Sequence, residues 1–153
     1  LDMAKKYGIE NPPNAGGGCL LTDPTFGLRV KDLFAHTETP TINDIDLLKI
    51  GRHFRLDEQT KFVVGRNKDE NEMIKAIALP EDILLHVRDH MGPVSILRGK
   101  NVDSYVKFAS SVTLRYSDSP KGEQVSVIIT RDNTKEEITA QGAEEESYLK
   151  FRI

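Results

Sequence analysis

Hydrophobic residues follow two spacings along the chain, and the change between them marks where helices give way to strands. Asp23 is a capping residue and Pro24 suits a first helical turn, so a helix is expected to begin here. Helical spacing places four apolar side chains on one of its faces: Phe26, Val30, Leu33 and Phe34. Thr41 predicts a second, short helix that ends near Gly51.

From Arg52 onward the spacing is that of short strands separated by helices. Strands are expected at 52–56, 61–64, 82–88, 94–97 and 124–130, with edge strands at 138–140 and 148–153. Asn67 begins one helix, with Glu70 as its capping-box partner, and a longer helix follows Asn101. This order predicts an α+β fold: a ββαββαβ-type mixed sheet with helices packed on it, preceded by a short helical segment.

Length and composition fit one domain with an appended segment. The chain has 153 residues, 38% hydrophobic and 29% charged, and no apolar run long enough to span a membrane. It begins at Leu1, inside what resembles a helix, so we expect it to be part of a longer protein. A single cysteine, Cys19, excludes an internal disulfide and is typical of the cytoplasm. We divide the chain into a segment 1–40 and a unit 41–153.

Charge is unevenly distributed. The net charge of −3 argues against a protein that coats nucleic acid through bulk positive charge. Between Lys49 and Lys68, however, basic residues far outnumber the acidic ones, which are Asp57 and Glu58. Such asymmetry indicates either a local anion-binding face or a solvated surface hairpin, and charge alone favours the hairpin.

Cys19 follows three consecutive glycines and lies shortly before the expected helix start at Asp23. Glycines let a substrate approach the backbone closely, and a helix N-terminus makes a nearby thiol more acidic and more nucleophilic. Cys19 is therefore the candidate catalytic residue. The alternative is a buried structural cysteine beside a flexible loop.

The strand that ends at Gly65 is followed by Arg66 and by the helix that Asn67 caps. A guanidinium group and a helix N-terminus both favour phosphate. The alternative is that Asn67 only caps the helix and Arg66 only pairs with a neighbouring carboxylate.

The strand expected at 82–88 carries a polar row. Alternation turns one set of side chains to the core and leaves Asp82, His86 and Arg88 on the other face, where they suit contact with RNA. His86 and His90 are about 13 Å apart on a strand, so no metal site is expected. The chain also lacks a Walker-type phosphate loop, a nucleophile elbow and a dinucleotide fingerprint, and it holds no complete active site.

Residues 63–99 resemble the RNA-binding domain known as NFACT-R. The features that carry the resemblance are Gly65-Arg66-Asn67, Asn71 on the next helix, the strand from Asp82 to His86 and the turn Gly92-Pro93. The strand tryptophan usual in that domain is Leu84 here. With the basic hairpin added, the residues predicted to bind RNA are Arg52, His53, Arg55, Arg66, Asn67, Lys68, Asn71, Asp82, His86 and Arg88.

Residues 7–34 resemble the end of the ATP-pyrophosphatase (PP-loop) domain of tRNA thiouridylase-like enzymes. The resemblance is carried by the tract from Ala15 to Phe26, followed by Arg29 and Asp32-Leu33. It implies a part in sulfur transfer for Cys19. ATP and Mg²⁺ would bind to a domain upstream of Leu1, so this segment is expected to hold no cofactor and to be inactive alone.

Together these patterns predict the tRNA-binding C-terminal module of an ATP-dependent tRNA-thiolating enzyme. Its expected partners are tRNA and a sulfur-donor protein, with no membrane. The alternative is a docking or dimerisation module for the sulfur donor that does not bind RNA. An autonomous enzyme ranks last among the three hypotheses.

Overall fold

A computed structural model describes residues 24–120 and 122–153. Two helices come first, α1 (Pro24–His36) and α2 (Ile42–Leu48). The remaining elements are β1 (Arg52–Asp57), β2 (Thr60–Val64), α3 (Lys68–Ile77), β3 (Ile83–Val87), β4 (Ser95–Gly99), the 3₁₀ helix η3 (Val102–Tyr105), α4 (Val106–Arg115), β5 (Val125–Arg131), β6 (Thr134–Ala140) and α5 (Glu145–Leu149). The predicted α+β class is confirmed.

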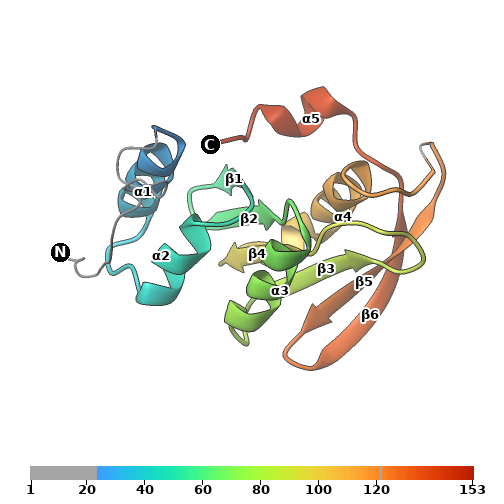
Figure 1. The fold of residues 1–153 in the computed structure, drawn as a ribbon, viewed down its shortest axis with the longest axis horizontal. Coiled ribbons are helices and arrows are strands. Elements are labelled where there is room, and N and C mark those ends of the chain that lie inside the picture. Colours follow the sequence, from blue (N-terminus) through green and yellow to red (C-terminus); the bar gives the residue numbers. More distant parts are fainter. Residues whose placement is uncertain (1–23, 121) are drawn as a thin grey trace.

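The six strands form one sheet in the order β1-β2-β4-β3-β5-β6 (Figure 1). Every pairing between neighbours is antiparallel, where the sequence led us to expect a mixed sheet. The reason is that β4 returns between β2 and β3, the two strands on either side of α3. These two strands run in the same direction, but each pairs with β4 and they never pair with each other.

One side of the sheet, which we call the α4 face, carries the main core. Alternate residues of the strands, among them Phe54, Phe62 and Leu85, pack there against α4 and α5. Val112 of α4 and Tyr148 of α5 are almost fully buried in this cluster. Figure 1 shows α4 and α5 on this side of the sheet.

The opposite side, which we call the α3 face, is covered over only part of its width. Val63 and Ile96 pack there against Leu47 of α2 and Ile74 of α3. Helix α1 lies outside α2 and packs on it (Figure 1). On the same face, β3, β5 and β6 present half-buried and exposed side chains. The α3 face therefore has a covered half and an uncovered half.

The C-terminal segment differs from the predicted edge strand at 148–153. It forms α5 and then a single bridge between Arg152 and Phe54 on the outer edge of β1. The aromatic ring of Tyr148 explains the difference, because it is buried in edge contacts with Phe54 and Tyr116. In α1, Phe34 was expected on the buried face but is 60% exposed.

The hairpin between β5 and β6 makes a two-residue turn at Asp132 and Asn133. Both residues have positive φ angles, 45° and 68°. This is the turn conformation that matches the twist of two antiparallel strands, and Asp and Asn tolerate it better than most residues. The turn extends β6 to Thr134, four residues before the start expected from the sequence. None of the described helices is long and apolar enough to cross a membrane.

Candidate nucleic-acid interface

The turn between β2 and α3 holds three of the predicted RNA-binding residues, Arg66, Asn67 and Lys68. Asn67 caps α3, because its side-chain oxygen accepts the Glu70 backbone N–H at 2.9 Å. Glu70 accepts two bonds from the Arg66 guanidinium, at 3.0 and 2.7 Å, and one from the Arg66 backbone N–H at 2.9 Å. The bonds from Arg66 hold the pKa of Glu70 at about 2. A cap and an internal ion pair thus occupy this motif, although 46% of the Arg66 side chain stays exposed.

Asn71 connects α3 to the loop before β4. Its side-chain oxygen accepts the Val94 backbone N–H at 3.0 Å. The same oxygen lies so close to Gly65 that a Cβ at position 65 would overlap it. Gly65 therefore makes room for Asn71, and Asn71 positions α3 on the sheet.

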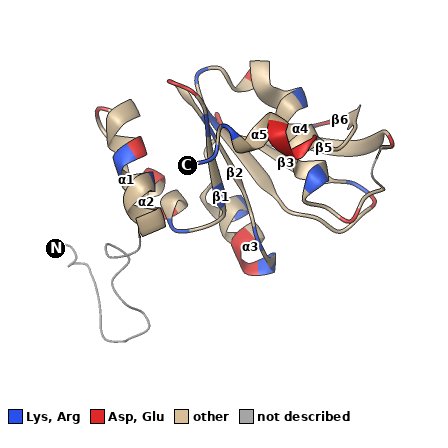
Figure 2. Ribbon diagram, turned by 90° about the horizontal axis from the view of Figure 1, so that it is seen from above, with Lys and Arg blue, Asp and Glu red and all other residues tan. Residues whose placement is uncertain are grey.

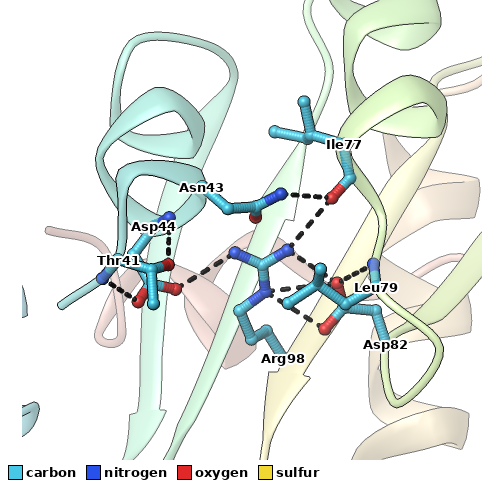
Figure 3. Close-up of polar contacts among 7 residues, drawn as sticks. All are labelled: Thr41, Asn43, Asp44, Ile77, Leu79, Asp82 and Arg98. Atoms are coloured by element: carbon cyan, nitrogen blue, oxygen red, sulfur yellow. Dashed lines mark hydrogen bonds and ion pairs between the residues drawn. The ribbon is translucent and has the colours of Figure 1, made fainter. Parts of the chain in front are cut away.

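Asp82 does not lie in the exposed polar row that the sequence predicted. It lies just before β3, is 4% exposed, and accepts bonds from Arg98 at 3.1 and 2.7 Å and from the Leu79 N–H at 2.8 Å (Figure 3). Arg98 also donates to Asp44 of α2 at 3.2 Å. This network joins α2, β4 and the loop before β3, so we leave Asp82 out of any RNA-facing surface.

His53 is fully buried under the helices. Its Nε2 lies 2.8 Å from the Ile50 carbonyl oxygen. Burial, helped by the nearby charges of Lys61 and Arg29, holds the pKa of His53 well below its ordinary value. A neutral ring with no exposed surface cannot contact a phosphate in this conformation, so His53 also lies outside the candidate interface.

Arg52 and Arg55 point to opposite sides of β1. The Arg52 guanidinium lies 4.4 Å from the centre of the Tyr116 ring, at the end of α4. Arg55 is 16% exposed on the α3 face, where its Nε and Nη2 donate to Asp32 of α1 at 3.1 and 2.5 Å. The two arginines therefore do not form one phosphate-binding surface.

His86 is exposed on the uncovered half of the α3 face. Partial burial comes first among the causes that lower its pKa, and the positive charges of Lys135 and Lys75 follow. The register brings Lys135 of β6 opposite Thr130 of β5, which lies opposite Leu84 of β3. Lys75 of α3 and Lys135 of β6 thus both lie near enough for their charges to lower the pKa of this histidine.

Arg88 follows β3 and is 55% exposed. Its Nη1 donates to both carboxylate oxygens of Glu137 at 3.2 Å. An ion pair this exposed contributes little to stability, so a phosphate could replace the carboxylate at small cost.

One flank of α3 borders the same surface. Lys68, Asn71 and Lys75 are three and four residues apart, so they lie along one stripe of the helix. Asn71 accepts a hydrogen bond from the Val94 N–H, and the charge of Lys75 lowers the pKa of His86, so this stripe faces β3.

We call the uncovered half of the α3 face the open face. Its residues are Leu84 and His86 of β3, Ser126, Ile128 and Thr130 of β5, and Lys135, Glu137 and Thr139 of β6. Lysines here can hold phosphates, and hydroxyl groups can bond to base edges and to 2′-hydroxyls. No Phe, Tyr or Trp side chain lies among these residues, so His86 carries the one ring that they offer for stacking on bases. Figure 2 shows charges of both signs on α3.

Sequence reasoning missed Lys75, Lys135 and Arg98. The spacing of Lys68, Asn71 and Lys75 was a usable signal for the first. The other two depend on strand register, which places Lys135 across from β3 and Arg98 beside Asp82.

The candidate catalytic residue Cys19 lies outside the described residues. The other site prediction concerned metals, and among residues 24–120 and 122–153 no group of His, Cys, Asp and Glu side chains could hold a metal ion.

Residues 51–152 match the family model NFACT-R_2, described as the NFACT protein RNA binding domain. A solved structure of similar fold is the C-terminal part of the fibronectin/fibrinogen-binding protein from Streptococcus suis, with a TM-score of 0.57 and 12% sequence identity. The similarity covers 84% of this chain and 67% of that one, and at this identity it concerns the fold alone. No curated protein matches the chain.

Proposed function

This chain belongs to the NFACT-R_2 family of RNA-binding domains, and from that premise we propose that it binds RNA on the open face. The observation that carries the placement is that the strand register sets Lys135 across the sheet from β3 and that Lys135 and Lys75 both lie near enough to lower the pKa of His86. These residues come from α3, β6 and β3, and only the folded sheet brings them together.

Single-stranded or looped RNA suits this surface. Lysines on both borders can hold the backbone, while the strand residues between them reach unpaired bases and 2′-hydroxyls. Because few cations lie here, we expect moderate affinity and a shallow salt dependence. Three phosphate contacts to a single strand give a slope of about −2 in a plot of log K against log salt.

The finer proposal is that the RNA is tRNA and that the parent protein is a cytoplasmic tRNA-thiolating enzyme. Its support is the resemblance of residues 7–34 to thiouridylase-like enzymes, a tract that ends within α1 and begins outside the described residues. ATP and Mg²⁺ belong to the proposed upstream domain, and Cys19 would carry or transfer sulfur. If a Cys19→Ser substitution in the longer protein left tRNA thiolation unchanged, this role of Cys19 would be wrong.

The test of RNA binding is a titration of labelled tRNA and of a single-stranded RNA with the whole chain at two salt concentrations. We expect the double substitution Lys75→Glu and Lys135→Glu to weaken binding at least about tenfold, since it removes two phosphate contacts and adds two repulsive charges. The matched control is the double substitution Lys107→Glu and Lys150→Glu. It makes the same charge change at two exposed lysines on the α4 side.

Equal weakening by both double substitutions would mean that net charge, not the open face, governs binding. Absence of binding by the folded wild type would reject the proposal. It would favour the alternative hypothesis, a docking or dimerisation module for a sulfur-donor protein.

A further inference from the structure

A second polar site lies at the far end of the sheet from β5 and β6. Helices α1 and α2 and strands β1, β2 and β4 enclose a pocket of about 130 Å³. That volume is far above the roughly 10–15 Å³ needed to hold one water molecule. One wall, including Leu33, His36 and Asp44, comes from residues before the family match at 51–152, so the pocket combines the matched domain with the preceding helices.

Two arginines line this pocket in fixed positions. Arg55 is held by Asp32 of α1, and Arg98 by Asp82 and Asp44. Both guanidinium groups are mostly buried, at 16% and 14% exposed. The Nη1 group of Arg55 makes no hydrogen bond within the described residues, so it still has donors to offer.

Lys61 also lines the pocket. It lies directly across from Arg55 in the β1–β2 pairing and is 7% exposed. Among the residues that the structure describes, none forms a hydrogen bond or an ion pair with the Lys61 amine. A buried ammonium group without a partner is costly, so this position favours either a neutral amine or a ligand that supplies the missing acceptor.

We propose that this pocket binds a small oxyanion of the phosphate class, whose oxygens accept hydrogen bonds from Lys61 Nζ and Arg55. A phosphate group has the size and the several acceptor oxygens that the lysine and the fixed guanidinium can share. The oxyanion is either free phosphate or sulfate, or the terminal phosphate of an RNA chain. The proposal does not rest on RNA binding at the open face.

The protonation of Lys61 and the charges around it make anion binding depend on pH. Burial lowers the pKa of Lys61 to about 7. The charged and titratable groups around it are Arg29, Asp32 and His36 of α1, Asp44 of α2, His53 and Arg55 of β1, Glu58 in the β1–β2 turn, Arg98 of β4, and Asp82, which pairs with Arg98. Because four carboxylates here face three guanidinium groups, the protonated Lys61 supplies the positive charge that an anion needs. Binding must therefore be strongest below pH 7 and weaken as Lys61 loses its proton above it.

Sulfate is the first probe, because it does not titrate between pH 6 and pH 8.5. The experiment follows backbone and side-chain NMR signals of the whole chain during sulfate titration, at constant ionic strength set with chloride. We expect saturable shifts at Lys61 and Arg55, and an affinity at least about tenfold lower at pH 8.5 than at pH 6.5. Lys61→Met should remove the saturable shifts, since it keeps the aliphatic stem and deletes the charge. The matched control Lys135→Met should keep them.

Wild-type signals that show no saturation below about 10 mM sulfate, a range of weak association, would overturn the proposal whatever the variants do. Saturation that persists in a folded Lys61→Met chain would also overturn it.

The source of the anion is identified by letting RNA oligomers of one sequence, or inorganic phosphate, compete with sulfate. Displacement of sulfate by a 5′-phosphorylated oligomer, and not by its 5′-hydroxyl form, identifies an RNA end. Displacement by inorganic phosphate alone identifies a free anion.

The open-face variant with Lys75→Glu and Lys135→Glu separates the two proposals. It should lose RNA affinity and retain sulfate binding. Loss of sulfate binding in this variant would show that the lysines around His86, and not the pocket, hold the anion.

Discussion

The covered and the uncovered halves of the α3 face contain charged residues of the same types, held in different ways. In the covered half, Arg98 and Arg55 are mostly buried and bonded to carboxylates of neighbouring elements. On the open face, Lys135 is exposed without an ion pair among the described residues, and Arg88 meets Glu137 at the surface. Removing a partner from a buried pair leaves an uncompensated charge, whereas an exposed pair costs little to break.

This difference separates structural cations from those available to a ligand. Arg98 in the covered half is already satisfied, and its loss is expected to unfold the protein before it affects binding. A lysine on the open face contributes little to folding, so its loss is expected to appear in binding alone. The predictions below test this separation, from the largest expected effect to the smallest.

The largest effect is expected from Arg98→Met. Among the described residues, the substitution leaves the Asp82 carboxylate, at 4% exposed, with the Leu79 N–H alone as a partner, and it removes the bond from Arg98 to Asp44. Breaking a buried ion pair from one side costs about 3–5 kcal/mol in free energy of unfolding. Urea denaturation measures this loss. The control Arg88→Met, at an exposed pair, should cost less than about 1 kcal/mol. Similar losses for the two variants would remove the distinction between the halves.

The second effect concerns the Arg66–Glu70 pair and depends on pH. The pKa of Glu70 is lowered from 4.5 to about 2, so the ionised form stabilises the fold above its ordinary pKa, and this stability is lost as pH falls toward about 2. Glu70→Gln should therefore lower the free energy of unfolding by about 2 kcal/mol near neutral pH, less than the full pKa shift would give, because Arg66 is 46% exposed and solvent screens the pair. The difference from wild type should shrink as the pH falls below about 4, where wild-type Glu70 begins to protonate. A difference that stays constant down to pH 2 would contradict this assignment.

Local signals were enough to locate most elements. Asn67 with Glu70, and Thr41 with Asp44, are short-range capping patterns, and both helices begin where these residues predict. In the second case the structure shows both bonds of a capping box. In the first, Glu70 bonds to the Arg66 N–H, one residue before the cap.

Prediction failed where distant parts of the chain decide the outcome. Alternation correctly assigned Leu85 to the core and His86 to the opposite face, but it could not show that Asp82 meets Arg98. That contact depends on the β3–β4 register and on the covering helices. His53 similarly resembles a surface residue of a basic hairpin until α1 and α2 are placed over it. Residue type indicates a possible chemistry, and packing decides whether it is exposed.

The third prediction concerns base stacking, because the open face carries no Phe, Tyr or Trp side chain. Leu84 is half-buried at the border between α3 and the open face. Leu84→Trp would place an aromatic ring beside His86, and stacking on one RNA base contributes about 1–3 kcal/mol. We expect tighter binding to single-stranded RNA, measured by fluorescence titration. The control Leu149→Trp adds the same ring to the exposed surface of α5 and should leave affinity unchanged. Equal gains would show that the RNA is not held on the open face.

The smallest effect is expected from protonation of His86. Its pKa is lowered by partial burial and then by Lys135 and Lys75, so the ring is neutral at pH 7. Below that lowered pKa the ring becomes a third cation between the two lysines. Binding of an oligouridine, whose bases do not titrate in this range, should therefore strengthen roughly two- to fivefold as the pH falls from 7.5 to below that lowered pKa. His86→Gln should remove this rise, and His90→Gln should keep it.

Protonation of His86 has opposite effects on RNA binding and on folding, so two separate measurements test the role of this residue. A histidine whose pKa is lowered in the folded state binds its proton less well than in the unfolded chain, so protonation destabilises the free protein. Acidification should thus weaken the fold slightly and strengthen RNA binding through one residue. If both trends vanish in His86→Gln, the histidine lies against the bound phosphates. If only the stability trend vanishes, His86 titrates without touching RNA, and the lysines bind on their own.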